Sequence, residues 1–310
     1  MSVNSAEVLF VKSVKDGIPN RDPLNDSDAR RIFGEDDGRI SLSDVSIKRD
    51  VRDYVLAKYP DGGEQKRYFI FCRQERTEDG KLLGREGLAK ETLKKAGFNG
   101  DVERDPLLKA GYDVRLFGAV YSVKNGSFNQ TGPVQFGWAH SLHPVESKYV
   151  QGTVVMPSQA EGKTQGTIWT TYIVPFAVFA MPAVINATIA KDTGLDEQDV
   201  ELLLESLWQG TKHRQARGRG FQQPLFLMHV EYSDPFFRIG YLEDYLKLEP
   251  SSDVWQGGAP PTSVSEIKLD VTELAEVLAQ YSDKIARIRY WTVPELNIKG
   301  EIPGEKCCLW

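Results

Sequence analysis

One amphipathic helix and the basic loop that follows it in the sequence constrain the fold of this chain most. From Asp196 to Trp208, apolar residues recur on one stripe, acidic residues fill the first turn and Gly210 follows, which predicts a helix packed on a core. The stripe comprises Val200, Leu203, Leu204, Leu207 and Trp208. The loop from Trp208 to Gly220 carries Lys212, Arg214, Arg217 and Arg219 and no acidic residue. The sequence therefore predicts a positive loop anchored to a buried helix.

Composition limits what that loop can do. The 310 residues carry a net charge of -6, which argues against a protein that binds nucleic acid through its summed positive charge. Any nucleic-acid site in such a chain has to be a local groove. Forked guanidinium donors suit phosphate oxygens, and glycines let backbone N–H groups approach a polyanion closely. The alternative is an ordinary solvated basic loop.

Strand and helix patterns alternate along the rest of the chain. Apolar and β-branched runs predict strands at 8–14, 68–73, 113–123, 133–145, from 170, 224–232 and 285–291. Helical spacing predicts helices at 43–55, 85–98, 196–208 and 272–281. Lys-Asn-Gly-Ser at 124–127 predicts a hairpin turn between two of the strands. The element order resembles an elaborated βαββαβ unit.

Two polar stretches interrupt this order. Glycine and charge are dense between residues 61 and 111, which is typical of an insertion outside the core. Residues 146–166 are rich in Gly, Gln, Ser and Lys and predict a projecting loop or hairpin.

The first predicted helix carries a second basic surface. Lys48 and Arg52 lie four residues apart on one face, and Arg49 lies beside them. Asp50 and Asp53 partly neutralise this face, so an ordinary exposed helix surface is the alternative interpretation. Aromatic residues such as Phe136, Trp138 and Phe221 could stack bases near a groove, or they could belong to the core.

Common catalytic and metal-binding signatures are missing from the chain. Cys72, Cys307 and Cys308 form neither a disulfide framework nor a zinc site with CxxC spacing. His140 and His143 would diverge if they lie in a strand. No Gly-x-Ser-x-Gly, Walker, Rossmann or His-Glu-x-x-His arrangement occurs. We therefore expect no catalytic residue, no metal and no cofactor.

The expected location of the protein is the cytoplasm. The first residues lack a positive region followed by an apolar core, which a secretory signal requires. The longest apolar run, 173–190, contains Pro175, Pro182, Asn186 and Thr188 and predicts a buried strand that leads into a helix. We expect no contact with a membrane.

Four sequence blocks together resemble a known family. They are Lys-Asp-Gly-Ile-Pro-Asn-Arg-Asp-Pro from Lys15, Ser-Asp-Val-Ser-Ile-Lys-Arg-Asp-Val-Arg-Asp-Tyr from Ser43, Asp-Val-Arg-Leu-Phe-Gly-Ala-Val from Asp113 joined to Thr-Gly-Pro-Val-Gln-Phe from Thr131, and Trp-Gln-Gly-Thr-Lys-His-Arg-Gln-Ala-Arg-Gly from Trp208. With these blocks the chain resembles the repeating backbone subunit of Cascade, the RNA-guided surveillance complex of type I CRISPR systems, in its Csh/Csd branch of the RAMP superfamily. Arg21 departs from the glycine that is usual there, and the loop before Ile173 is diverged.

The resemblance implies a fold and a set of contacts. The fold is α+β, with an RNA-recognition-motif-like (ferredoxin-like) palm at 1–60, 112–145 and 167–310, fingers at 61–111 and a thumb hairpin at 146–166, all in one elaborated domain. The implied contacts with guide RNA are Lys48, Arg49, Arg52, His213, Arg214, Arg217 and Arg219. Lys148, Met156 and Lys163 are candidates in the thumb.

The resemblance also implies a function. Copies of the chain would form a helical filament along CRISPR guide RNA and hold its sugar-phosphate backbone, so that the bases can pair with a target DNA strand. Other Cascade subunits would be further partners.

Two alternatives remain open at this stage. Related type III backbone subunits cut target RNA with an aspartate in an early loop, which would implicate Asp22 or Asp26 in metal-dependent cleavage. Both lie in a cluster with Asp16 and Asp28 whose spacing departs from the EF-hand pattern. The other alternative is a stand-alone RNA-binding module, although the aromatic RNP1 pattern is absent.

Overall fold

A large sheet forms the centre of the molecule. The computed structural model describes residues 3–25, 28–34, 36–123, 126–154, 168–257 and 259–310. Strand β1 (Ala6–Lys15) lies in the middle of the sheet and pairs antiparallel with β9 (Phe176–Ile185) and β10 (Phe221–Tyr232). The full order is β15-β13-β10-β1-β9-β6-β2, and β5 also pairs with β9. The outer strands are β2 (Ser41–Leu42), β5 (Val134–Phe136), β6 (Ala139–Ser141), β13 (Ile285–Thr292) and β15 (Glu305–Lys306).

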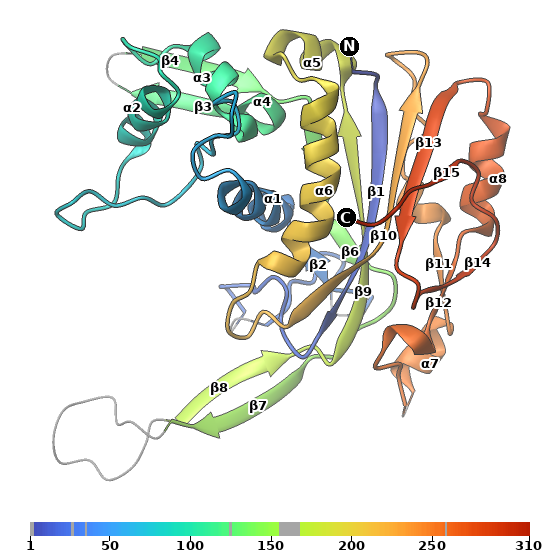
Figure 1. Cartoon of the computed structure of the whole chain (residues 1–310). Coiled ribbons are helices and arrows are strands. Elements are labelled where there is room, and N and C mark those ends of the chain that lie inside the picture. The colour runs from blue at the N-terminus through green and yellow to red at the C-terminus, as the bar shows by residue number, and fades with distance from the viewer. Residues whose placement is uncertain (1–2, 26–27, 35, 124–125, 155–167, 258) are drawn as a thin grey trace, which may run out of the picture.

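Both faces of this sheet are covered, which follows from the composition of β1. Val8 and Phe10 point into one core cluster, whereas Leu9 and Val11 point into another, because side chains alternate along a strand. A strand that is apolar at successive positions has to be buried on both faces. The sheet is therefore the middle layer of three (Figure 1).

The first outer layer contains helices α1 (Asp44–Lys58), α5 (Ala187–Thr193) and α6 (Glu197–His213) (Figure 1). The predicted stripe of α6 is buried, as are Ile47, Val51 and Val55 of α1. Gly210 was expected to end α6, but the helix continues to His213. A β-carbon on Gly210 would lie 2.4 Å from the carbonyl oxygen of Asp50, so this glycine instead lets α6 approach α1.

The second outer layer covers the opposite face with the C-terminal part of the chain. It contains α7 (Ser252–Gln256), α8 (Thr272–Gln280) and the short turns η1 (Leu242–Tyr245) and η2 (Val264–Glu266). A small sheet of β11 (Lys247–Glu249), β12 (Lys268–Asp270) and β14 (Asn297–Lys299) completes the layer. Leu274 and Leu278 of α8 pack in the same cluster as Leu9.

A finger-like projection is built around a cluster of its own. It contains α2 (Arg85–Lys95), α3 (Arg104–Ala110), α4 (Tyr112–Phe117) and the hairpin of β3 (Gly118–Val123) and β4 (Gly126–Thr131). Buried side chains from Phe69 to Tyr121 form its cluster, against which Phe128 packs. This packing continues past residue 111, which was the predicted end of the insertion.

Two strand predictions in this region are wrong. The run predicted as a strand from residue 113 begins as helix α4, and only 118–123 is extended. All six residues of α4 are buried, including Asp113 and Arg115, and charged residues alternate with apolar ones from 112 to 116 as they do in a strand. Residues 68–73 form one isolated bridge, between Phe69 and Gly111, and no strand. The partner of β3 is β4, whereas β5 and β6 join the large sheet.

A second projection is the predicted hairpin. Strands β7 (Lys148–Thr153) and β8 (Ile168–Ile173) pair antiparallel and extend away from the body (Figure 1). The candidate thumb residues Met156 and Lys163 lie outside the described residues. Residues 173–190 form the end of β8, the buried strand β9 and part of α5, which agrees with the predicted strand that leads into a helix. No helix in the described ranges has the length and apolarity to cross a membrane.

Candidate nucleic-acid interface

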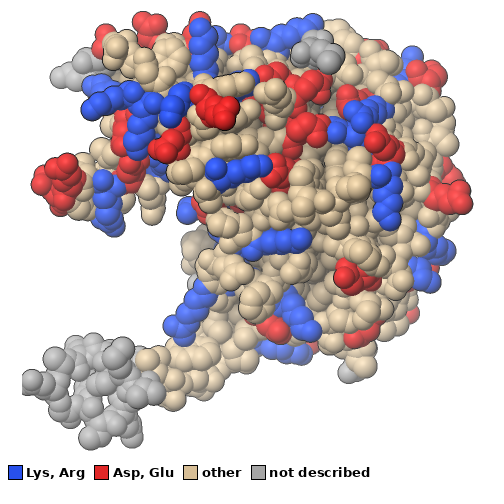
Figure 2. All heavy atoms as spheres, viewed as in Figure 1, with Lys and Arg blue, Asp and Glu red and all other residues tan. Residues whose placement is uncertain are grey.

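A basic groove opens between α1, the loop after β1 and the loop that joins α6 to β10. It has a volume of about 820 Å³, and eight of its nineteen lining residues are arginines whereas one, Asp44, is acidic. The arginines are Arg21, Arg30, Arg49, Arg52, Arg73, Arg214, Arg217 and Arg219. Figure 2 shows Lys and Arg side chains along the edge of the notch between the two projections. We call this site the arginine groove. A concave surface with this excess of fixed positive charge suits a polyanion.

The basic residues of α1 lie in different environments. Arg49 is exposed in the groove and its Nε lies 2.5 Å from Asp53 Oδ1. Lys48 is not among the residues that line the groove. Its Nζ is 2.9 Å from Oδ2 of Asp44, which does line it, and 5.6 Å from the centre of the Phe117 ring. Of this pair, Arg49 is the one that lines the groove.

Arg52 connects the body to the finger projection. Its Nε lies 2.8 Å from Oδ2 of Asp113, which is buried. The same carboxylate accepts the backbone N–H groups of Phe71 at 2.8 Å and Cys72 at 3.0 Å. Arg52 therefore has a structural partner in addition to its place in the groove wall, and its removal would disturb this junction.

Below the groove, one buried carboxylate holds three cations. Asp50 lies 3.3 Å from Lys12 Nζ, 2.9 Å from Arg214 Nη1 and 2.8 Å from Arg219 Nη2. Burial lowers the pKa of Lys12 from 10.5 to about 8, since desolvation and the two guanidinium groups outweigh the attraction of Asp50. We call these four residues the Asp50 cluster. Its positive charges outnumber its negative charge by three to one.

The arginines of the loop between α6 and β10 differ in burial. Arg219 is buried on Asp50 and forms part of the groove wall, and burial lowers the pKa of its guanidinium. Arg217 is exposed, and its guanidinium lies 5.5 Å from the centre of the Trp169 ring on β8. Arg21 Nη2 donates to Thr171 Oγ1 at 3.0 Å and to the Gly218 carbonyl at 3.3 Å. These contacts connect the loop to the root of the β7–β8 hairpin.

The glycines of this loop have a packing role. A β-carbon on Gly17 would lie 2.0 Å from the backbone nitrogen of Gly220, so the two loops meet backbone to backbone. The sequence suggested that these glycines let a polyanion approach the backbone. At Gly220 the glycine is instead needed for the close packing of the two loops.

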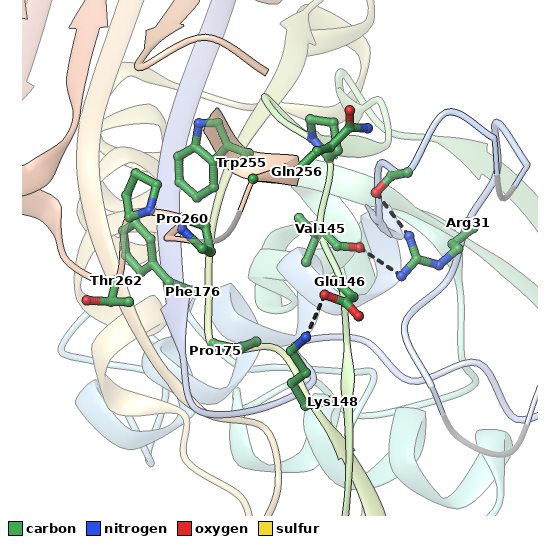
Figure 3. A pocket seen from close by; sticks show the side chains of 14 residues that line it. Arg31, Val145, Glu146, Lys148, Pro175, Phe176, Trp255, Gln256, Pro260 and Thr262 are labelled. Carbon is green, nitrogen blue, oxygen red and sulfur yellow. Dashed lines mark hydrogen bonds and ion pairs between the residues drawn. The ribbon is translucent and has the colours of Figure 1, made fainter. Parts of the chain in front are cut away.

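Two other predicted residues lie away from the groove lining. His213 ends α6, is exposed and has its ring centre 6.4 Å from that of Tyr54. Lys148 begins β7 and its Nζ lies 2.5 Å from Glu146 Oε2. Figure 3 shows Lys148 near Glu146 and Pro175 in the wall of a second cavity of about 740 Å³, whose lining also includes Trp255 and Phe176. There Arg31 donates to the carbonyls of Gly38 at 3.0 Å and Val145 at 2.9 Å.

The early-loop aspartates form turns in the structure. Asp22 Oδ1 accepts the backbone N–H of Leu24 at 3.0 Å. Asp28 accepts the N–H of Ala29 at 2.6 Å and the hydroxyl of Ser147 at 2.9 Å. Asp26 lies outside the described residues. Within the ranges given above, no three His, Cys, Asp or Glu side chains come together as a metal site.

Comparison with known proteins identifies the family. Residues 4–272 match the family described as CRISPR-associated protein Cas7. The chain belongs to the Cas7 family. The resemblance seen in its four sequence blocks is thereby confirmed at the level of this family.

This Cas7 chain has a curated relative and similar solved structures. The CRISPR-associated protein Cas7 of Haloferax volcanii is 29% identical over 310 residues, which cover 92% of this chain and 85% of the relative. A chain of a "CRISPR RNA-guided surveillance complex, pre-nicking" matches with a TM-score of 0.59, covering 99% of this chain and 96% of that one. A chain of a "CRISPR RNA-guided surveillance complex" matches at 0.55, with coverages of 99% and 95%. Both are 16% identical to this Cas7 chain and show a common mixed α+β fold.

The structure adds four cations to the site that sequence analysis did not select. Lys12, Arg21, Arg30 and Arg73 lie in the groove wall or in the Asp50 cluster of this Cas7 chain. Lys12 had a signal in the sequence, because it interrupts the apolar strand Val-Leu-Phe-Val-Lys. Arg73 lies in a loop without periodicity, and it donates to the Ile70 carbonyl at 2.5 Å. Only the fold brings these segments together.

Proposed function

We propose that this Cas7 chain is a backbone subunit of Cascade that polymerises along guide RNA. The arginine groove is the observation that carries the proposal, because eight of its lining residues are arginines and one is acidic. Such a surface binds phosphate and sugar without reading the bases. The bases stay free to pair with a target DNA strand, which is the division of labour in RNA-guided recognition.

The order of the central strands supports the finer proposal of an RNA-recognition-motif-like palm. Strands β10, β1, β9 and β6 are neighbours, and α1 and α6 cover one face. In a stand-alone module of this type, RNA stacks on the other face of the sheet. Here α8 and the small sheet pack on that face. This arrangement favours the groove over the sheet as the RNA site and disfavours the stand-alone module.

We infer that the subunit holds RNA without cutting it. The proposed ribonuclease alternative needs a metal beside Asp22 or Asp26, and Asp22 instead accepts a backbone N–H within its own turn. A cleavage assay with Mg²⁺ or Mn²⁺, guide and target RNA tests this inference. Metal-dependent cleavage that disappears in Asp22→Ala would restore the enzymatic alternative.

The groove is tested by removing two arginines that reach it. In Arg49→Gln with Arg217→Gln, two phosphate contacts are lost, so the slope of log affinity against log salt falls by about 1.4. Fluorescence anisotropy with guide RNA at several salt concentrations measures this slope. Lys247→Gln is the control, since Lys247 is exposed, pairs with Glu273 and lies in the opposite layer. An unchanged slope in the double variant would exclude the groove.

Assembly is tested by mass. Head-to-tail contacts between copies produce an open helical filament whose length follows its template. The complex co-expressed with a CRISPR repeat-spacer transcript should therefore gain mass in steps as the spacer lengthens and lose its order after ribonuclease treatment. A single copy per RNA at every spacer length would instead support the stand-alone module.

A further inference from the structure

A separate pocket lies at the edge of the sheet, beyond the arginine groove. It has a volume of about 630 Å³ and is bounded by β5, β9, the loop around Phe33 and the loop before η1. Phe33, Trp138 and Tyr241 contribute aromatic rings, and Glu7 and Glu243 contribute carboxyl groups. We call it the aromatic pocket. Trp138 also lines the arginine groove, so the two sites share one wall.

The rings at the mouth of this pocket are unusually exposed. The exposed fraction is 47% for Phe33, 37% for Trp138 and 76% for Tyr241. Tyr241 has a φ of 51°, in the left-handed region that a bulky side chain adopts only at a cost. Several exposed aromatic side chains in the lining of one pocket are typical of an interaction surface, where tyrosine and tryptophan are common anchors.

The carboxyl groups inside the pocket lack cationic partners in the described part of the chain. Glu7 is buried and accepts the N–H groups of Ile239 at 2.9 Å and Gly240 at 3.1 Å, as well as the Tyr232 hydroxyl. It thereby fixes the loop that carries Tyr241. Glu243 Oε2 is buried and has no hydrogen-bond partner among the described residues.

The environment of Glu243 favours a cation from outside. Burial raises the pKa of its carboxyl, and the nearby charges of Asp244 and Glu7 add to the effect. Arg238 is the one lysine or arginine in the described lining, and it is exposed. His140 adds little charge, since burial lowers its pKa. The interior therefore carries two carboxyl groups against one solvated guanidinium.

We propose that the aromatic pocket is a docking site for a protein partner that inserts an arginine or lysine side chain. Arg39 lies 4.2 Å from the centre of the Phe33 ring and Arg30 lies 5.9 Å from that of Trp138, so the ring left for an incoming cation is Tyr241. A guanidinium or ammonium group can lie against this ring and donate to Glu243, which supplies the donor that Oε2 lacks. Phosphate is disfavoured by the two carboxyl groups, so charge complementarity selects a basic protein segment over RNA. The proposal does not depend on the function of the groove.

The test uses the full-length chain and two small probes. Ligand-observed NMR measures binding of N-acetyl-arginine amide and of N-acetyl-citrulline amide, which has nearly the same shape without the charge. We expect arginine to bind about tenfold more tightly than citrulline, the ratio typical of one charge-assisted hydrogen bond. Equal binding of the two probes would overturn the proposal.

Three variants locate the bound probe. Glu243→Gln should weaken arginine binding about tenfold, whereas Glu301→Gln, an exposed control outside the pocket, should leave it unchanged. Tyr241→Gly removes the ring while its backbone suits glycine, so it should weaken binding and keep the fold. Unaltered arginine binding in Glu243→Gln would reject the site. Loss of guide RNA binding in Tyr241→Gly and Glu243→Gln would also reject it and assign the pocket to RNA.

Discussion

The two ends of α6 carry ion networks that differ in their charge balance. At the N-terminal end, Asp199 lies 2.7 Å from both Arg115 and Arg67, and Asp196 lies 2.7 Å from Arg67. Two carboxylates thus meet two guanidinium groups. At the C-terminal end, the Asp50 cluster has one carboxylate for Lys12, Arg214 and Arg219. The same helix therefore ends in a neutral network on one side and a positive one on the other.

This difference distinguishes a network whose charges balance from one that keeps an excess of positive charge next to the arginine groove. The helix dipole favours carboxylates at the first turn and cations at the last, so both ends agree with it. Only the N-terminal network is complete, and it joins α6 to the finger projection through Arg67 and Arg115. The C-terminal network lies below the arginine groove, and its cations outnumber its carboxylates even with Asp53, which lies 3.9 Å from Arg214, included. A bound anion would complete it.

The largest effect is expected at the balanced end. Asp199→Asn leaves the buried Arg115 guanidinium without its charged partner, which should lower the free energy of unfolding by about 3–5 kcal/mol. Urea denaturation measures this loss, and Glu301→Gln serves as an exposed control. Single-stranded RNA should not restore the stability. A loss below about 1 kcal/mol would mean that this network is not structural.

At the C-terminal end of α6, we expect a loss of stability that bound RNA partly reverses. Asp50→Asn removes the buried carboxylate that all three cations contact, and we expect a loss of about 3 kcal/mol in the free energy of unfolding. The phosphates of bound RNA replace part of that charge, so guide RNA should raise the melting temperature of this variant more than that of Asp199→Asn. Equal shifts in the two variants would remove the distinction between the two ends.

Lys12 makes the positive end sensitive to pH. Its pKa is about 8 in the folded chain and 10.5 in its ordinary state. Between these values the unfolded chain binds more protons, so this group makes stability rise with pH, by at most about 1.4 kcal/mol per pH unit. Its burial is most unfavourable below pH 8. Lys12→Met should therefore be more stable than wild type at pH 7, and the difference should shrink towards pH 10.5 in urea titrations. A constant difference would contradict the lowered pKa.

The smallest expected effect is on RNA affinity, and it distinguishes Lys48 from its neighbour Arg49 on α1. Lys48→Gln should change the affinity for guide RNA less than twofold, an effect of about 0.4 kcal/mol or less, since Lys48 does not line the groove and is paired with Asp44. Arg49→Gln, which alters a residue of the groove wall, should have the larger effect in the same anisotropy assay. The reverse order would move the RNA path to the other face of α1.

Periodic segments could be predicted from the sequence, and contacts between distant segments could not. The apolar stripes of α1 and α6 repeat at helical spacing and correctly predicted two helices. Helix α4 is buried on all sides and buries Asp113 and Arg115 between apolar residues, so its sequence alternates with a period of two and was predicted as a strand. The ion pair of Lys12 with Asp50 joins residues 38 positions apart and depends on the placement of α1 on the sheet.

The candidate site shows the same limit. The basic loop after α6 was visible as a composition, but composition does not distinguish the buried Arg219 from the exposed Arg217. Likewise, the spacing of Lys48, Arg49 and Arg52 placed them near one another and did not reveal that Asp44 and Asp113 are partners for two of them. Burial and partner choice are properties of the assembled fold.

Trp138 has a consequence for the energetics of the molecule. Its indole is a wall of both the arginine groove and the aromatic pocket. An occupant that shifts or fixes this ring in one site changes the free energy of binding in the other. Thermodynamic linkage requires the two changes to be equal, so each occupant would alter the affinity of the other by the same factor. Through this one side chain, the two sites have the means to communicate.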